Sequence, residues 1–349
     1  MKNTLFVILL SMFSSFAQAT VVLVYHHVSE KTPKSTSITP TQFELHLNYF
    51  KDNDFKVIPL SEMVDKLKAK QPLEDRTIVI TFDDGYSDIL TNGHPLLQKF
   101  GYPYTMFINP NTVPNKSGMY LDWAQIKQMS DDGVIIANHG LVHDSLIKAP
   151  KGVDAQTWLE QKLDELQQSE QIIKDKVDQN WKYFALPYGE YTPQAQQQLA
   201  SMGYAVFTQQ SGPVGDTTDI TAIPRFPASM PYDQLGPLKD KLNSLAFTVS
   251  AKSQRAQTIV PFGEQPDKTV EVSLNDFYPN MLACFIAGGG KAEITWQGEE
   301  SFTMNFDANF KPGRNRSNCT APSISKPGRF YWYSRPWFVP KADGSWYTD

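Results

Sequence analysis

Short apolar runs alternate with amphipathic segments over the first two thirds of the chain. Each run has the length and the β-branched or aromatic content of a buried strand. Six strands are predicted in this way: VVLVY (21–25), TIVITF (77–82), YTMFI (104–108), VIIA (134–137), YFAL (183–186) and YAVFT (204–208). Strands that alternate with helices predict a parallel sheet or barrel, in which catalytic groups gather at the carboxyl ends of the strands.

Helical patterns lie between these strands. In TPTQFELHLNYFKD, Thr39 is the predicted N-cap and Pro40 the first helical residue, and the apolar residues that follow share one helical face. A longer helix is predicted over 154–177, and a third in TPQAQQQLASMG, where Gly203 ends it. These helices would cover the faces of the sheet.

The pattern changes beyond residue 230. From Leu245 to Asp349 there are only short apolar or alternating runs between Gly, Pro and Asn turns, which is typical of a β-sandwich. The runs are LAFTVSA, TVEVSL, MLACFIA, KAEITW and SFTMNF. We predict four parts: a leader over 1–19, an α/β domain over 20–230, a linker over 231–244 and an all-β, sandwich-like domain over 245–349.

The first residues predict export. MKNTLFVILLSMFSSFAQA combines Lys2, an apolar run and a small-x-small ending, which is typical of a secretory signal cleaved after Ala19. An N-terminal membrane anchor is the alternative, although the run is shorter than the ~20 residues of a spanning helix. No later stretch is long and apolar enough to cross a bilayer, so we expect a periplasmic or secreted protein without stable membrane insertion.

Charge and cysteine content narrow the partners and the redox state. The formal net charge of −5 offers no basic footprint, so nucleic acid is not an expected partner. Cys284 and Cys319 are an even pair in a chain predicted to be exported, which favours one disulfide. That bridge would join the strand run MLACFIA to the loop-like RSNCTAPS. Two buried free thiols remain the alternative.

Two strand ends carry the candidate chemistry. TIVITF runs directly into Asp83, Asp84 and Gly85, and adjacent carboxylates at a strand end require a neutralising cation. His139 and His143 follow the strand VIIA four residues apart, so a helix or tight turn would aim both imidazoles at one point. Either histidine alone would be interpreted as a surface or core residue. Together with a carboxylate they form a three-ligand set typical of a catalytic divalent metal, with zinc preferred.

Three motifs resemble a known family. TFDDG, HGLVH and LPYG, in this order, resemble the first three motifs of the polysaccharide deacetylases, carbohydrate esterase family 4, over roughly 21–229. The resemblance implies an irregular (β/α) barrel that removes N-acetyl groups from an amino-sugar glycan such as poly-N-acetylglucosamine, chitin or peptidoglycan. Two alternatives stay open: an O-acetyl esterase of xylan-type glycans with the same fold, and a glycan-binding protein without turnover.

The same resemblance implies roles for the residues of the two strand ends. Asp83 matches the general base of the family. Its neighbour Asp84 matches a metal ligand, as do His139 and His143. In this assignment the base stands beside the metal without being one of its ligands.

Further roles follow from the third motif and the first strand. In PYG, which alone would be an ordinary turn, the backbone N–H of Tyr188 is expected to stabilise the oxyanion, and Gly189 to let the turn approach the substrate. His26, after the strand VVLVY, is the expected general acid for an amine leaving group. His27 would point to the other side of the strand and be structural.

The chain departs from the family at three places. Ala185 stands where many members have an arginine that steers the base; Arg225 would replace it by reaching Asp83, or else form a surface or inter-strand salt bridge. Gly140 replaces a common Ser or Thr, which predicts one missing hydrogen bond near the metal. No clear Asp-Trp motif follows PYG, because Asp122 of Asp122-Trp123 comes too early and is a predicted helix N-cap.

Aromatic residues crowd the end of the chain. GRFYWYSRPWFVPKADGSWY includes Trp332, Trp337 and Trp346. Exposed aromatic rings could stack on sugars, whereas alternating aromatic residues in a strand would bury half of their number in a sandwich core or a domain interface. The pattern alone leaves both interpretations open.

Overall fold

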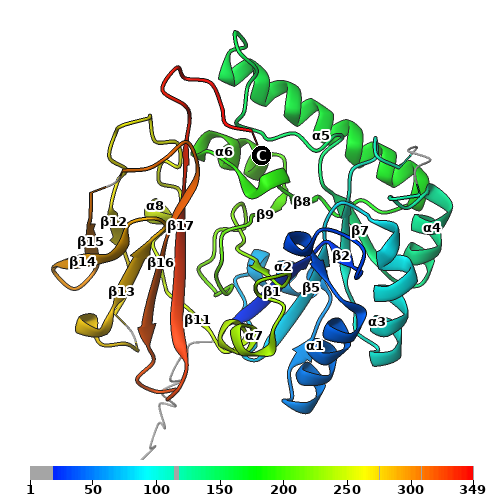
Figure 1. Cartoon of the computed structure of the whole chain (residues 1–349), viewed down its shortest axis with the longest axis horizontal. Helices are drawn as coiled ribbons and strands as arrows, with labels where there is room; N and C mark the ends of the chain where they lie inside the picture. Colours follow the sequence, from blue (N-terminus) through cyan, green and yellow to red (C-terminus); the bar gives the residue numbers. More distant parts are fainter. Residues whose placement is uncertain (1–18, 114–117, 275, 308, 349) are drawn as a thin grey trace, which may run out of the picture.

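The computed structural model describes residues 19–113, 118–274, 276–307 and 309–348. The predicted leader therefore lies outside the described residues except for Ala19. Figure 1 shows an α/β domain beside a second, strand-rich domain, with the first domain in blue to green and the second in yellow to red. None of the described helices is long and apolar enough to cross a membrane.

The first domain is built on a curled, 8-stranded parallel sheet in the order β10-β1-β5-β6-β7-β8-β9, with β4 paired to β5. All six predicted strands are present, and TIVITF keeps its predicted bounds. The strands are β1 (Thr20–Tyr25), β4 (Lys56–Val57), β5 (Thr77–Phe82), β6 (Thr105–Ile108), β7 (Ile135–Asn138), β8 (Tyr183–Ala185), β9 (Ala205–Phe207) and β10 (Phe226–Pro227). A small separate pair joins β2 (His27–Val28) to β3 (Ser37–Ile38).

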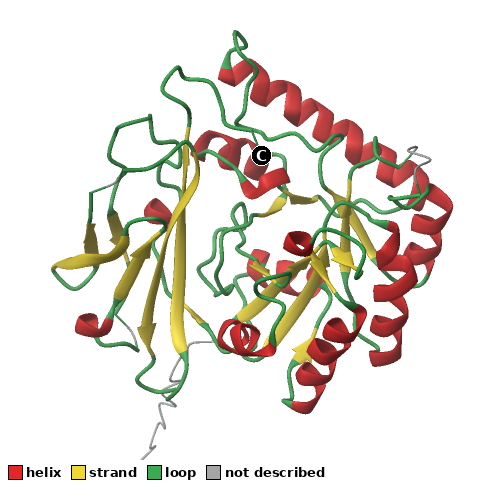
Figure 2. Cartoon of the chain, in the orientation of Figure 1, coloured by secondary structure: helices red, strands yellow, loops and turns green. Residues whose placement is uncertain are grey.

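Helices cover the outside of this sheet (Figure 2). They are α1 (Pro40–Asp52), α2 (Leu60–Lys68), α3 (His94–Phe100), α4 (Trp123–Asp131), α5 (Ala155–Val177) and α6 (Pro193–Ser201), with short turns η1 (Lys34–Thr36), η2 (Ile89–Gly93) and η3 (Pro187–Gly189). Two predicted caps are confirmed: Thr39 accepts a hydrogen bond from the backbone of Gln42, and Asp122 caps α4. The prediction of an α/β barrel-like domain is confirmed.

The second domain is a 7-stranded sheet in the order β11-β17-β16-β13-β14-β15-β12. Strand β14 pairs with β13 through its first residues and with β15 through its later ones, so the sheet folds into two layers around one apolar core. The elements are β11 (Leu245–Ala246), α8 (Ala251–Gln254), β12 (Thr269–Glu271), η4 (Pro279–Met281), β13 (Ala283–Ile286), β14 (Gly290–Gln297), β15 (Ser301–Asn305), β16 (Gly313–Pro322) and β17 (Phe330–Val339). The predicted sandwich-like domain is confirmed.

The predicted disulfide is confirmed, but the predicted position of Cys319 in a loop is wrong. Cys284 and Cys319 form a disulfide, so the alternative of two free thiols is wrong. Cys319 does not lie in a loop: it is in the middle of β16, directly opposite Cys284 of β13. The bridge therefore joins two neighbouring strands of the sheet.

The terminal aromatic residues lie mainly in packed positions. Trp337 is fully buried in the core of the second domain, and Trp332 packs against Phe226 of the first domain with ring centroids 5.3 Å apart. Helix α7 (Leu235–Leu242), inside the predicted linker, buries Leu238 and Leu242 in the core of the first domain. The two domains therefore share a packed interface.

Candidate active site

The two adjacent carboxylates leave β5 in different directions. The backbone N–H of Asp83 donates to the carbonyl of Tyr25 and so continues the pairing of β5 with β1. Asp84 and Gly85 then both adopt φ of 73°, a left-handed conformation that ends the strand abruptly. As a result Asp83 lies against Arg225 and Asp84 against the two histidines.

Arg225 reaches Asp83, as one of the two sequence interpretations predicts. Its Nη1 and Nη2 donate to Oδ1 and Oδ2 of Asp83, both at 2.7 Å, and both side chains are completely buried. Its Nε donates to the carbonyl of Thr208 at 3.1 Å. Burial acts to raise the pKa of Asp83, but Arg225, together with His139 and His26, outweighs it and leaves the pKa lowered.

A network of asparagines holds the loop that carries the histidines. Asn138, the last residue of β7, accepts from the N–H of Gly140 at 2.8 Å and donates to the carboxylate of Glu170 on α5 at 3.0 Å. Asn109, after β6, donates to the carbonyls of His139 and Gly140. These bonds hold the backbone of His139 and Gly140. They lie at the position where the sequence predicted one missing hydrogen bond.

Gly140 itself answers a steric requirement. Its φ is 87°, and a Cβ built there would lie 2.9 Å from the carbonyl oxygen of Val142. A serine or threonine at this position would therefore collide with the loop backbone.

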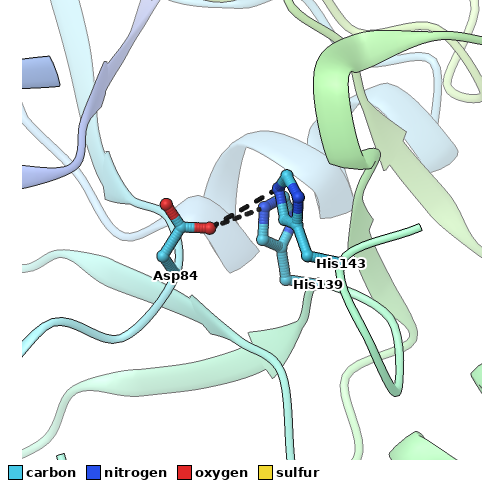
Figure 3. Close-up of side chains that lie close together, drawn as sticks. All are labelled: Asp84, His139 and His143. Atoms are coloured by element: carbon cyan, nitrogen blue, oxygen red, sulfur yellow. Dashed lines mark ion pairs between the residues drawn. The ribbon is translucent and has the colours of Figure 1, made fainter. Parts of the chain in front are cut away.

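Asp84, His139 and His143 converge on one point (Figure 3). One ligand atom from each lies within 4.8 Å of the others. Oδ1 of Asp84 is 3.3 Å from Nε2 of His139 and 3.6 Å from Nε2 of His143. One carboxylate and two imidazoles are a donor set typical of a divalent metal. Three protein ligands leave coordination positions free for water and substrate.

The hydrogen bonding of His139 fits a metal ligand. Its Nδ1 lies 2.8 Å from the carbonyl of Ala185, so Nδ1 must carry the proton that is donated. Its Nε2 is buried and makes no hydrogen bond to any described residue. An orphaned buried nitrogen that points at a carboxylate and a second imidazole is a position that a cation would satisfy.

The local charges favour positive charge at the same point. Burial acts to lower the pKa of His139, but Asp83 and Asp84 outweigh it and leave that pKa raised. The pKa of His143 is lowered to about 4, first by burial and then by His139. For Asp84, burial acts to raise the pKa, but His139, His26 and His143 outweigh it and leave that pKa lowered. His143 is thus neutral and Asp84 ionised near pH 7, as metal ligands must be.

The PYG turn lies on the histidine side of the site. Tyr188 has φ of 60°, and its ring meets that of His143 edge-on with centroids 4.5 Å apart. Gly189 has φ of 71°, and a Cβ there would lie 2.5 Å from the backbone nitrogen of Gln209. Gly189 thus lets the turn pack closely against Gln209, and its expected approach to the substrate stays a prediction.

His26 and His27 take different surroundings. His26 is half-buried directly after β1, and burial lowers its pKa while the nearby carboxylates of Asp83 and Asp84 oppose the lowering. The Nδ1 of His27 lies 2.6 Å from Asp88, and its ring stacks on Tyr86 at 3.7 Å. The charges that act on His26 thus come from the candidate site. His27 instead contacts the segment that follows Asp84 and Gly85 in the chain.

Several residues around the site carried no signal in the sequence. Asn109 follows β6 and Asn138 ends β7, and both are ordinary residue types at such positions. Tyr86 lies close enough to Asp84 for that charge, after burial, to raise its pKa. Glu190, directly after PYG, is a fully buried carboxylate. Only their positions next to strand ends or motifs could have drawn attention to them.

The comparison of sequences agrees with this geometry. The sequence profile of the family described as "Polysaccharide deacetylase" matches residues 70–207. The Staphylococcus aureus poly-beta-1,6-N-acetyl-D-glucosamine N-deacetylase is 27% identical over 175 residues, which are 48% of this chain and 58% of that protein. The Bacillus subtilis protein YxkH, assigned by name to the polysaccharide deacetylases, is 26% identical over 183 residues, 52% of this chain and 61% of its own. The chain thus spans about three-fifths of these curated relatives.

Solved structures share the fold of the first domain. The Streptococcus pyogenes deacetylase PplD, solved with acetate, has a TM-score of 0.57 at 20% identity and covers 65% of this chain and 99% of its own. IcaB from Ammonifex degensii has the same TM-score of 0.57 at 24% identity, with 65% of this chain and 97% of its own covered. At these identities the likeness concerns the fold.

Proposed function

Residues 70–207 belong to the polysaccharide deacetylase family, and on this premise we propose that the chain is a metal-dependent hydrolase that removes N-acetyl groups from an amino-sugar polysaccharide or oligosaccharide. The observation that carries the proposal is that a candidate metal site and a separate buried carboxylate lie side by side. The convergent atoms of Asp84, His139 and His143 lie next to Asp83, a buried carboxylate that is not part of that set. A site that only bound glycans would not need a base beside a metal.

Three residues would hold the ion. Asp84 offers an ionised carboxylate, and His139 and His143 offer their Nε2 atoms. When bound, a divalent cation, for which we prefer zinc, lowers the pKa of water from 15.7 toward about 7 and polarises the carbonyl under attack.

The remaining steps fall to this chain's own residues. The ionised Asp83, whose two oxygens accept from both Nη atoms of Arg225, would accept the proton of the attacking water. The backbone N–H of Tyr188 would donate to the oxyanion of the tetrahedral intermediate. His26 would then protonate the amine as it leaves, a step that an amide needs and an activated ester barely needs.

We further propose that the substrate is met outside the cytoplasm. The pattern of residues 1–19 supports export, and the Staphylococcus aureus relative is named for an N-acetylglucosamine polymer. Poly-N-acetylglucosamine, chitin and peptidoglycan fragments are therefore the first substrates to test.

Acetate release from a panel of acetylated glycans tests the function. We expect release from an N-acetylated amino-sugar polymer, loss of release with a chelator, and recovery with zinc or cobalt. Release only from O-acetylated xylan would replace the proposal by an esterase, and binding without release by a glycan-binding protein. Full activity of metal-free protein would contradict the mechanism.

Matched variants separate base from ligands. Asp83→Asn should keep the bound metal and lose about 10²–10⁴-fold in turnover, because its shape is kept and its basicity is lost. His139→Ala should lose the metal itself, as elemental analysis would record. If Asp83→Asn also loses the metal, Asp83 is a ligand and the division of roles is wrong.

A further inference from the structure

Glu190 joins the second domain to the candidate active site. It follows the PYG turn directly and its side chain is completely buried. The hydroxyl of Ser145, two residues beyond His143, donates to its Oε2 at 2.6 Å, and the hydroxyl of Tyr347 donates to its Oε1 at 2.6 Å. One buried carboxylate thus links the histidine loop, the PYG turn and the last residues of the second domain.

Two cations also lie close to Glu190. Nζ of Lys148 and Nη1 of Arg314 lie 3.2 and 3.6 Å from its Oε1. The same two cations lie over the ring of Tyr188, at 5.0 Å for Lys148 and 5.5 Å for Arg314. Arg314 comes from β16, so the second domain touches both the turn residue and the carboxylate beside it.

The neighbouring residue is held from the same side. Thr258 of the second domain donates its hydroxyl to the carbonyl of Tyr191, and the ring of Tyr191 packs against Phe338 of β17 with centroids 6.1 Å apart. Consecutive residues 190 and 191 are therefore both anchored on the second domain.

The backbone of Tyr188 needs such support. Its φ of 60° is unfavourable for a residue with a Cβ, and conformations of this kind persist only where the surroundings fix them. The turn itself is short: η3 spans Pro187–Gly189, and the N–H of Gly189 donates to the carbonyl of Leu186 at 2.9 Å.

From these contacts we propose that the second domain is a positioning element of the active site: through Arg314, Tyr347 and Glu190 it holds the PYG turn, and hence the backbone N–H of Tyr188, in its reactive place. This inference rests on the proposed deacetylase function. It assigns the second domain a part in turnover, distinct from recruitment of the glycan. Glu190, Arg314 and Tyr347 are positioning residues, because they act through Tyr188.

The second domain offers a matched control on the opposite edge of the barrel. Asp75 precedes β5, whose other end carries the site, and it pairs across the domain boundary with Arg329 at 2.7 and 3.0 Å and with Lys326 at 2.6 Å. Glu190→Gln and Asp75→Asn both turn an interdomain carboxylate into an amide. Only the first touches the PYG turn.

The test measures kcat and KM for acetate release, bound metal and melting temperature in the full chain. We expect Glu190→Gln to lower kcat by about 10- to 100-fold, the effect of a displaced catalytic group, with KM within about twofold and metal content unchanged. Asp75→Asn should leave kcat at the wild-type value even where it lowers the melting temperature equally.

Milder variants keep the test informative if Glu190→Gln does not fold. Tyr347→Phe and Arg314→Met should each lower kcat by about 3- to 10-fold, and Arg314→Lys should recover part of the loss because it retains the charge. An active wild type with unchanged kcat in all these variants overturns the inference alone, as does a change confined to KM. A wild type without activity on any glycan overturns the proposed function, and this inference with it.

Discussion

Two buried cations lie next to the short strand β10, and they have different kinds of partner. Arg225, immediately before the strand, is completely buried and gives both Nη atoms to the carboxylate of Asp83. Lys241 of α7 is 5% exposed and donates to the carbonyl of Pro227 at 2.6 Å, with its Nζ 3.8 Å from the ring centroid of Tyr232. Arg225 therefore has a carboxylate as its partner. Lys241 instead has a backbone carbonyl and an aromatic ring.

The difference shows what a buried charge requires. Arg225 keeps Asp83 ionised against the effect of burial, so the pair places a usable carboxylate inside the protein. For Lys241, burial prevails and lowers the pKa from 10.5 to about 7. The paired charge belongs to the candidate site, whereas burial disfavours the charged form of Lys241 at neutral pH.

Breaking the first pair should have the largest effect. Arg225→Met leaves Asp83 buried without a counter-charge, which costs about 3–5 kcal/mol in the free energy of unfolding and should lower turnover by at least about 10²-fold as Asp83 becomes protonated. Urea denaturation and acetate release measure the two effects. The double variant Asp83→Asn/Arg225→Met should recover part of the stability and none of the activity. No recovery would mean that Arg225 acts mainly through its other hydrogen bonds, to the carbonyl of Thr208 at 3.1 Å and to the hydroxyl of Thr81 at 3.2 Å.

Making the first cation resemble the second should have an intermediate effect. Arg225→Lys keeps the charge and loses the two parallel hydrogen bonds, so we expect turnover to fall by about 10- to 100-fold with the metal still bound. Kinetics with elemental analysis check this. Wild-type turnover would show that charge alone, without the planar fork, is sufficient to orient Asp83.

Removing the second cation should have the smallest effect and a distinctive pH dependence. Because the folded pKa of Lys241 is below its ordinary value, the unfolded chain binds more protons between about pH 7 and 10.5, and the wild type gains stability with pH across that window. Lys241→Met should therefore be more stable than wild type by about 1–3 kcal/mol at pH 6, with the gain shrinking toward pH 10.5. A pH-independent difference would show that Lys241 titrates normally.

The sequence predicts those parts of the site that are local in the chain. Asp84 directly follows an apolar strand, and His139 and His143 are four residues apart after another, so their convergence follows from strand ends meeting at one edge of a parallel sheet. Arg225 is 142 residues from Asp83, and only the missing arginine at Ala185 directed attention to it. Glu190 and Tyr347 are 157 residues apart and follow no pattern that would pair them.

Strand β16 was not predicted, and the reason is different. In β16 the buried positions are Ser317, Cys319 and Ala321, all small, so the alternation that marks a strand is weak in the sequence. The strand forms because β13 and β17 flank it on both sides. Pairing of this kind is a property of the assembled sheet and overrides local propensity.

The place of β10 in the sheet also sets an order of assembly. Strand β1, formed from the first described residues, can have both neighbours only after residues 226 and 227 exist, because β10 pairs along one of its edges and β5 along the other. Arg225 arrives with that last strand, 142 residues after Asp83. Such distant contacts form late in folding, because loop closure must precede them. The ion pair that fixes Asp83 therefore cannot form before β10 pairs with β1, so the candidate site is complete only when the barrel is closed.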